Sequence, residues 1–358
     1  MLLSLHKAFW DMKYTSKQIS KAGEIITTSS DLIAVAGAIS KVNEWREQHL
    51  PVIELLMNEI QSVFAKSSIN PVFSSYRLKR MTSIQYKLDL NPDMRLGGMQ
   101  DIAGGRFVFS TIDSLRSAYS ILVQEHLEQL EVVKKDDYVD EKPKSSGYRS
   151  IHLVYKYHSL CNEEWDGMKV EIQLRTQLQH SWAMAVETAG LVTNTAMKSG
   201  QGSDEWQEFF QIISCLFAMK EKTIVVPSFC DETKASLIKR LQKLNDKYNF
   251  FDQLLALKLS VSEVEKHKYL GDIFLLYIDF NTKKLRIVPF SKEKKEEANE
   301  LYNKIETRIN DKDNAAVLVS VSKYKELREA YPSYFLDMDD FNKSIRKYLS
   351  LGRVLSKR

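Results

Sequence analysis

The stretch from Tyr138 to Glu187 constrains the fold more than any other part of this chain. It contains two runs in which apolar residues alternate with others, and the second of them is Lys169–Thr176. Because successive side chains of a strand point to opposite faces, Glu171, Gln173 and Arg175 share one face and the apolar residues between them share the other. The pattern predicts a sheet with one face in an apolar core and an acid, an amide and a cation along its other face.

The polar row has a simpler interpretation. Charged residues on one face of a strand commonly mark the face that meets solvent, and the spacing alone does not exclude this. What favours a functional site is the set of cations, acids and glycines found elsewhere in the same half of the sequence.

Composition and length indicate a globular protein with room for two domains. The chain has 358 residues, of which 44% are hydrophobic and 27% are charged. Its three cysteines lack the paired spacing of a disulfide framework or a zinc site, so we expect a reducing cytoplasm. No run approaches the roughly 20 apolar residues of a membrane span. The net charge of +4 is too small to indicate nucleic-acid binding by itself.

The order of predicted elements indicates an α/β fold followed by a smaller α+β unit. Helical patterns cover residues 17–66, and strands and helices then alternate up to about residue 187, which predicts a mixed sheet flanked by helices. A break between residues 221 and 232 indicates a linker. Beyond it we expect a helix, a hairpin, a charged helix and a strand. We therefore predict a domain over residues 1–222 and a C-terminal domain over residues 232–358.

Two groups of residues have the chemistry needed to bind phosphates and a metal. Arg77 and Lys79 share a strand face, while Ser83 and Lys87 are one helical turn apart, so the four could surround a triphosphate. Basic residues on a helix are also often just solvated. Asp101 precedes Gly104 and Gly105, where a metal and phosphates could approach the backbone, although an ordinary tight turn gives the same pattern.

A third group lies in the loop and strand that begin the Tyr138–Glu187 stretch: Lys144, Tyr148, Arg149 and His152. Together with the polar row they add cations and an aromatic ring to the two separated acids. Magnesium-assisted transfer from a nucleoside triphosphate needs carboxylates for the metal, cations for developing charge and a base for the accepting hydroxyl. The sequence has neither a P-loop nor the protein-kinase signatures.

Five ordered motifs between Tyr76 and Glu187 closely resemble the synthetase domain of the RelA/SpoT family. They are Arg77-x-Lys79-x-x-x-Ser83-Ile-x-x-Lys87, Asp101-Ile-Ala-Gly-x-Arg106, Asp137-Tyr138, Pro143-Lys144-x-x-Gly147-Tyr148-Arg149-Ser150-Ile151-His152 and Glu171-Ile-Gln173-Leu-Arg175-Thr176. The resemblance implies a nucleotidyltransferase-like fold and an ATP pyrophosphokinase, which transfers the β,γ-pyrophosphate of ATP to a 3′-hydroxyl. The His-Asp dipeptide typical of the family's hydrolase domain is absent from the sequence.

The resemblance also implies roles for individual residues. Asp101 and Glu171 would bind Mg²⁺, and Glu171 would activate the attacking hydroxyl. Arg77 and Arg106 would stack on the adenine of ATP, and its phosphates would meet Lys79, Ser83 and Lys87. The acceptor would contact the remaining residues, which are Lys144, Tyr148, His152, Gln173, Arg175 and His180.

The tail is similar to that of fused toxin–antitoxin members of the family, the CapRel-like group. Tyr331 and Tyr334 resemble the two tyrosines with which such members occupy their own ATP site until a phage protein binds. This implies tRNA, at its 3′ CCA end, as the acceptor, inhibition of translation and a role in anti-phage defence. A (p)ppGpp synthetase that uses GDP or GTP is the alternative, and a catalytically inactive nucleotide sensor is a further one.

Overall fold

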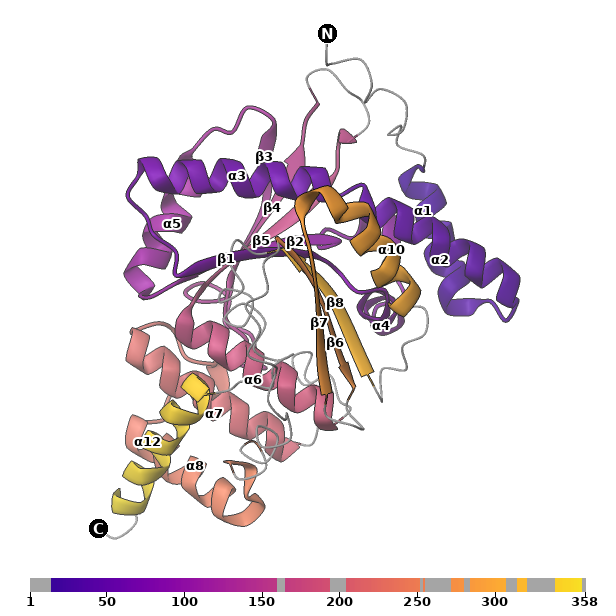
Figure 1. The fold of residues 1–358 in the computed structure, drawn as a ribbon. Coiled ribbons are helices and arrows are strands. Elements are labelled where there is room, and N and C mark those ends of the chain that lie inside the picture. Colours follow the sequence, from indigo (N-terminus) through magenta and orange to yellow (C-terminus); the bar gives the residue numbers. More distant parts are fainter. Residues whose placement is uncertain are drawn as a thin grey trace.

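A mixed β-sheet forms the centre of the protein. The computed structural model describes residues 14–159, 165–193, 204–251, 254, 272–279, 284–306, 314–320 and 339–355. Five strands lie in the order β3 (Leu130–Asp137), β4 (Ile151–Tyr157), β5 (Lys169–Thr176), β2 (Ala103–Phe109) and β1 (Phe73–Leu78). The β2–β5 pair is parallel and the other three pairs are antiparallel, which confirms the predicted mixed sheet (Figure 1).

Helices α3 (Leu50–Lys66) and α5 (Ile112–Gln124) cover the apolar face of this sheet. The side chains of Phe107, Ile172 and Leu174 are fully buried beneath them. The two adjacent glycines lie inside strand β2, so the tight turn that the sequence also allowed is not formed by them. A Cβ on Gly105 would lie 2.5 Å from the Met57 sulfur of α3, because the helix packs directly on the strand at this point.

Two further helical groups complete the molecule. At one end of the sheet, α1 (Ser16–Thr28), α2 (Leu32–Glu47), α4 (Met81–Leu90) and the short helix η1 (Leu96–Gly98) share an apolar core. The N-cap of α4 is Arg80, and Thr82 and Ser83 lie within the helix. The second core, rich in aromatic residues, joins α6 (Gln177–Thr193), α7 (Asp204–Glu221), η4 (Pro227–Phe229), α8 (Lys234–Tyr248) and α12 (Asp339–Leu355).

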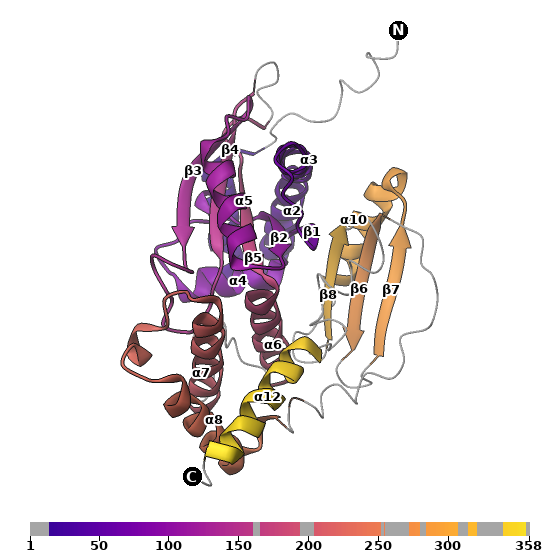
Figure 2. The same ribbon diagram turned by 90° about the vertical axis from the view of Figure 1, so that its left-hand side faces the viewer.

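The C-terminal strands extend the same sheet beyond β1. They are β8 (Asn314–Ser320), β6 (Ile273–Asp279) and β7 (Lys284–Phe290), and the helices η5 (Lys292–Lys294) and α10 (Lys295–Glu306) follow β7. The predicted hairpin is therefore confirmed as the antiparallel β6–β7 pair. A single register pair, Tyr76 with Ser320, joins β8 to β1. Figure 2 shows these three strands standing beside the β1 side of the five-stranded sheet.

The elements after residue 232 are divided between two places. Helices α8 and α12 pack on α6 and α7, whereas β6, β7, β8 and α10 lie beside β1. Helix α8 ends at Tyr248, because Asn249 adopts a left-handed conformation (φ 54°) just after it. The division into domains of residues 1–222 and 232–358 stays a prediction. Within the described residues, no helix combines the length and apolar character required to cross a membrane.

The two glycines of β2 provide a matched test of the packing between α3 and the sheet. We expect Gly105→Ala to lower the free energy of unfolding by about 1–3 kcal/mol, because its Cβ would overlap the side chains of Met57 and Ile172. A Cβ at Gly104 meets only the Glu171 carbonyl oxygen, at 3.7 Å, so Gly104→Ala should cost less. Urea denaturation of the two variants measures the difference. Equal losses in both variants would contradict this packing.

Candidate active site

The polar face of the sheet carries two rows of side chains that run across the strands. In the first row Arg77 of β1 lies opposite Gly104 of β2, which lies opposite Glu171 of β5. In the second row Ser75, Arg106, Gln173 and His152 follow one another across β1, β2, β5 and β4. The alternation predicted for β5 therefore places its acid and amide beside the cations of β1 and β2.

These rows form the floor of a cavity that contains both candidate metal-binding acids. About 450 Å³ of space lies between its walls, the open mouth included. Gly104 widens the cavity, because no side chain stands between Arg77 and Glu171 in the first row. The residues that line it are Ser75, Arg77, Lys79, Asp101, Gly104, Gly105, Arg106, Glu171 and Gln173.

Asp101 is held at this cavity by two lysines. Its carboxylate oxygens accept hydrogen bonds from the Nζ atoms of Lys79, at 2.8 Å, and Lys87, at 2.9 Å. Burial alone would raise the pKa of Asp101, but the two ammonium groups lower it to about 2. Burial lowers the pKa of Lys79. Asp101 is therefore ionised at neutral pH, and Lys79 and Lys87 converge on one point at the end of β1. Ser83 lies on α4, one turn before Lys87, and is not among the cavity-lining residues.

Glu171 belongs to a closed ring of hydrogen bonds. One of its oxygens lies 3.0 Å from Nδ1 of His152, and Nε2 of His152 lies 2.8 Å from the Tyr148 hydroxyl. Arg175 Nη2 donates to that hydroxyl at 2.5 Å and to Oε1 of Gln173 at 2.8 Å. Gln173 completes the ring by donating to the second oxygen of Glu171 at 2.7 Å. The ring fixes the orientation of the Glu171 carboxylate, since both of its oxygens have a partner.

The electrostatics of the ring favour a charged Glu171. Burial raises the pKa of Glu171, but His152 and the Gln173 amide outweigh this and bring it to about 2. Burial lowers the pKa of His152, whereas Tyr148 and Glu171 raise it to about 9. The pKa of Tyr148 is about 7, because Arg175 and His152 outweigh the opposite effect of burial. At neutral pH Glu171 is therefore ionised and His152 is protonated.

The loop before β4 is supported from α7. Gly147 has φ +88°, and a Cβ there would lie 2.9 Å from the Ser214 side chain, so glycine is required. Ser214 donates to the Gly147 carbonyl at 2.5 Å and accepts from Nε of the buried Arg149 at 3.1 Å. Arg149 is thus a structural residue of the loop. These contacts hold the Tyr148 hydroxyl next to His152 and Arg175, its partners in the hydrogen-bond ring.

Tyr138 contributes to the site, although no separate role was predicted for it. Its ring lies 5.2 Å from that of His152, and the Lys144 Nζ lies 4.1 Å from its centroid and 5.3 Å from that of Tyr148. Lys144 therefore rests over two tyrosines rather than one. The only signal in the sequence was the Asp137-Tyr138 motif, in which Asp137 caps the turn by accepting from the backbone of Val139 and Asp140.

His180 is one candidate residue that the described structure does not bring to this cavity. His180 lies buried on α6, with its ring 5.2 Å from that of Phe73, and it is not a cavity-lining residue. Tyr331 and Tyr334 lie outside the described residues.

The cavity suits a divalent cation of the magnesium type. Asp101 and Glu171 are both ionised at neutral pH and face the same cavity, and hard cations prefer such oxygens. The described residues contain no group of three or more acidic, histidine or cysteine side chains that could hold a metal ion. Magnesium is commonly bound by one or two carboxylates together with substrate phosphates and water, so two acids fit this cation.

Comparison with known proteins identifies the region that contains this site. Residues 76–191 match the family described as "Region found in RelA / SpoT proteins", so the chain contains this region. Two curated relatives are the GTP pyrophosphokinases YwaC, 32% identical over 120 residues, and YjbM, 30% identical over 145 residues, both from Bacillus subtilis strain 168. These matches cover 32% and 40% of this chain and only 56% and 59% of the relatives.

Solved structures with similarity to this chain include small alarmone synthetase 1 from Bacillus subtilis. It is 24% identical with a TM-score of 0.43, and the match covers 51% of this chain and 93% of that one. A second structure of that enzyme, bound to its product pppGpp, has a TM-score of 0.41 at 24% identity and covers 49% and 89% of the two chains.

The hydrogen-bond ring around Glu171 predicts a raised pKa for His152 in the protein without bound metal. We expect NMR titration to find the pKa of His152 at about 9, and Glu171→Gln to lower it, because the variant removes a charge that favours the protonated ring. A raised pKa also means that His152 stabilises the fold below its ordinary pKa of 6.5 and that this contribution is lost as the pH rises through 9.

The control is Glu131→Gln on the outer strand β3. It removes the partner of the exposed His158, 2.8 Å away, and should leave the pKa of His152 unchanged. If the pKa of His152 in the parent protein is close to its ordinary value of 6.5, His152 does not form these hydrogen bonds with Glu171 and Tyr148.

Proposed function

We propose that this protein is an ATP pyrophosphokinase, which transfers the β,γ-pyrophosphate of ATP to a nucleotide 3′-hydroxyl. The observation that supports this most is a single cavity lined by two ionised carboxylates and by the side chains of Lys79, Arg77 and Arg106, where Lys87 also binds the Asp101 carboxylate. The RelA/SpoT region and the names of the curated relatives support the same reaction.

The donor half of the site lies on β1, α4 and β2. In the proposed reaction Lys79, Lys87 and Ser83 bind the phosphates of ATP, and Arg77 and Arg106 contact its adenine. Lys79 and Lys87 already face one point through Asp101, so their charges are in place before the triphosphate arrives. Asp101 and Glu171 would hold Mg²⁺, which neutralises phosphate charge when bound.

The chemical step follows from the position of Glu171. The acceptor 3′-oxygen attacks the β-phosphorus of ATP, and the bond from that phosphorus to the oxygen shared with the α-phosphate breaks, which releases AMP. Glu171 takes the proton of the 3′-hydroxyl as general base. Its hydrogen bonds to His152 and Gln173 fix the carboxylate toward the cavity, and fixed orientation is a large part of what such a base supplies.

The acceptor half lies on the loop before β4 and on β5. Tyr148 stacks on the acceptor base, and Lys144, His152, Gln173 and Arg175 surround it. His180 has no role in this account of the site, because it packs against Phe73. The names of the relatives favour GDP or GTP as the acceptor, since both are called GTP pyrophosphokinases.

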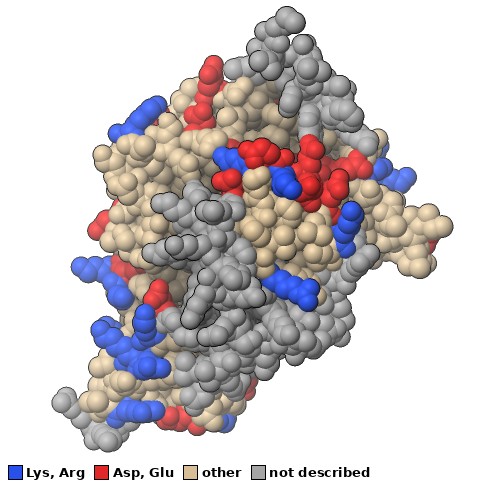
Figure 3. All heavy atoms as spheres, in the orientation of Figure 1, with Lys and Arg blue, Asp and Glu red and all other residues tan. Residues whose placement is uncertain are grey.

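The 3′ end of tRNA is a second candidate acceptor, and a surface charge supports it. Helices α8 and α12 expose many cations and few acids, and Figure 3 shows Lys and Arg side chains gathered over that end of the molecule. Helix α8 also contacts α7, which supports the acceptor loop. The exposed cations are Lys234, Lys239, Arg240, Lys243, Lys247, Lys343, Arg346, Lys347 and Arg353. Such a surface binds a phosphate backbone.

We also propose that the C-terminal region controls ATP binding. Strand β8 and helix α10 lie beside β1, the strand that carries Arg77, which supports an influence of this region on ATP binding. Occupation of the ATP site by Tyr331 and Tyr334, release by a phage protein and a toxin role in anti-phage defence stay predictions from the resemblance.

Incubation with γ-³²P ATP, GDP and bulk tRNA tests both the reaction and the acceptor. We expect label in GDP or in tRNA with the parent protein. Glu171→Gln should lower the rate roughly 100- to 10,000-fold, because it removes the general base, while ATP binding is retained. Glu131→Gln, an exposed glutamate on β3, is the matched control and should keep the parent rate. Label in neither acceptor, or full activity in Glu171→Gln, would contradict the proposal.

A further inference from the structure

Helix α7 directs a stripe of polar side chains toward the acceptor half of the site. Gln211, Ser214 and Glu221 follow one another at intervals of three and seven residues, which places them along one side of the helix. The apolar side chains of α7 lie in the aromatic core shared with α6, α8 and α12, so packing fixes the position of the helix. Helix α7 also lies beyond residues 76–191, the region shared with the family, so the match gives the stripe no role.

The first two residues of the stripe hold the loop before β4. Gln211 Nε2 donates to the carbonyl oxygen of Ser145 at 2.9 Å, and the Ser214 hydroxyl donates to that of Gly147 at 2.5 Å. Both carbonyls belong to the turn that leads directly into Tyr148. Two attachment points on one packed helix therefore fix the loop just before the ring that is proposed to stack on the acceptor base.

The last residue of the stripe holds the end of β5. Thr176 and Gln179 form a capping box at the start of α6, in which the backbone N–H of each donates to the side-chain oxygen of the other at 3.2 Å. Both side chains then donate to Glu221, the Thr176 hydroxyl at 2.5 Å and the Gln179 amide at 3.0 Å. Because each Glu221 oxygen has its own partner, this carboxylate fixes the backbone directly after Arg175.

The two parts held by α7 meet at one hydrogen bond of the ring around Glu171. Arg175 Nη2 donates to the Tyr148 hydroxyl at 2.5 Å. Tyr148 belongs to the loop held by Ser214, and Arg175 directly precedes the residue held by Glu221. An α-helix rises 1.5 Å per residue, so the seven residues from Ser214 to Glu221 keep the two attachment points about 10 Å apart. Helix α7 therefore sets the spacing at which Tyr148 and Arg175 meet.

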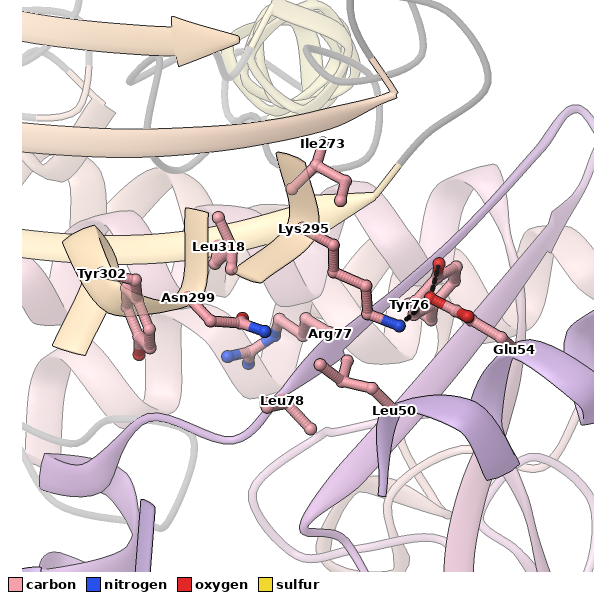
Figure 4. Close-up of a pocket in the computed structure, with 10 residues that line it drawn as sticks. All are labelled: Leu50, Glu54, Tyr76, Arg77, Leu78, Ile273, Lys295, Asn299, Tyr302 and Leu318. Atoms are coloured by element: carbon pink, nitrogen blue, oxygen red, sulfur yellow. Dashed lines mark hydrogen bonds and ion pairs between the residues drawn. The ribbon is translucent and has the colours of Figure 1, made fainter. Parts of the chain in front are cut away.

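The donor half of the site is supported by other elements. Figure 4 shows Arg77 of β1 lying near side chains of α3 and α10. Lys295 of α10 donates to Glu54 of α3 at 2.6 Å, and the Tyr76 hydroxyl of β1 donates to the same carboxylate at 3.0 Å. A change in the stripe of α7 should therefore alter the acceptor half and leave ATP binding as it is.

We propose that Gln211 and Glu221 of α7 are positioning residues for the acceptor, and that they act by fixing the spacing between Tyr148 and Arg175. This inference rests on the proposed function, in which the acceptor contacts both of those side chains. With the loop and β5 attached to one helix, these groups are in place before the acceptor arrives, and such preorganisation lowers the cost of binding and orienting it. Part of the acceptor site is thereby supplied by residues that follow the family region.

Steady-state kinetics with ATP, and with GDP and tRNA as acceptors, tests this role. Glu221→Gln keeps the size of the side chain but offers one accepting oxygen in place of two. It should lower kcat/KM for the acceptor roughly 10- to 100-fold, because small displacements of positioned groups are costly. Gln211→Ala, at a half-buried position, should act in the same direction without changing a buried charge. Calorimetry should find unchanged binding of a non-hydrolysable ATP analogue in both variants.

Glu205→Gln, the same substitution near the start of α7, is the matched control. It alters the carboxylate that accepts from the Tyr248 hydroxyl of α8, at the far end of the helix from Glu221, and should keep the parent values. An equal loss in Glu205→Gln, or a loss of ATP binding in step with acceptor use, would overturn the inference, because α7 would then only stabilise the fold.

A measurement without turnover separates this inference from the proposed reaction. Hydrogen exchange of the Arg175 guanidinium, followed by ¹⁵N NMR on the full chain and assigned with Arg175→Lys, reports how firmly Arg175 is held on Tyr148. We expect faster exchange in Glu221→Gln and Gln211→Ala, and the parent rate in Glu205→Gln. Parent rates in all variants would overturn the inference even if an acceptor is labelled. Faster exchange without labelling of GDP or tRNA would support the spacing role and contradict only the proposed reaction.

Discussion

The structure depends on charged groups that are buried against one another on one face of a sheet. Asp101 sits between two lysines, and Glu171 sits in a ring with His152 and Gln173. Removing charges from water is costly unless they are paired and hydrogen-bonded, and here each carboxylate has two partners. The pairing keeps both acids ionised at neutral pH and points them into one cavity, which is the state that metal binding and proton abstraction require.

Both faces of the sheet help to place the two carboxylates in one cavity. The apolar face packs so closely on α3 that Gly105 has no room for a side chain, and this fixes β2 beneath the helix. The adjacent Gly104 points to the other face and leaves space between Arg77 and Glu171. A pair of neighbouring glycines therefore has two different functions, one in packing and one in shaping the cavity. Neither function needs the turn that the sequence suggested.

The sequence predicted the parts of the site that follow from local pattern. The alternation in β5 placed Glu171, Gln173 and Arg175 on one face, and the motif resemblance singled out Asp101 and its lysines. It did not predict the hydrogen-bond ring, because that ring needs the loop around Tyr148 to be held by Ser214 of α7, which lies 67 residues after Gly147 in the chain. Nor does periodicity reveal which distant strands pair. Among the pairings it did not reveal is that of β8, from the predicted C-terminal domain, with β1.

The most direct measurement of the central claim is a crystal structure with a non-hydrolysable ATP analogue and Mn²⁺, whose anomalous scattering locates the ion. We predict one ion in contact with both Asp101 and Glu171, with the triphosphate on Lys79 and Lys87. An ion bound by neither carboxylate, or a triphosphate outside this cavity, would contradict the account.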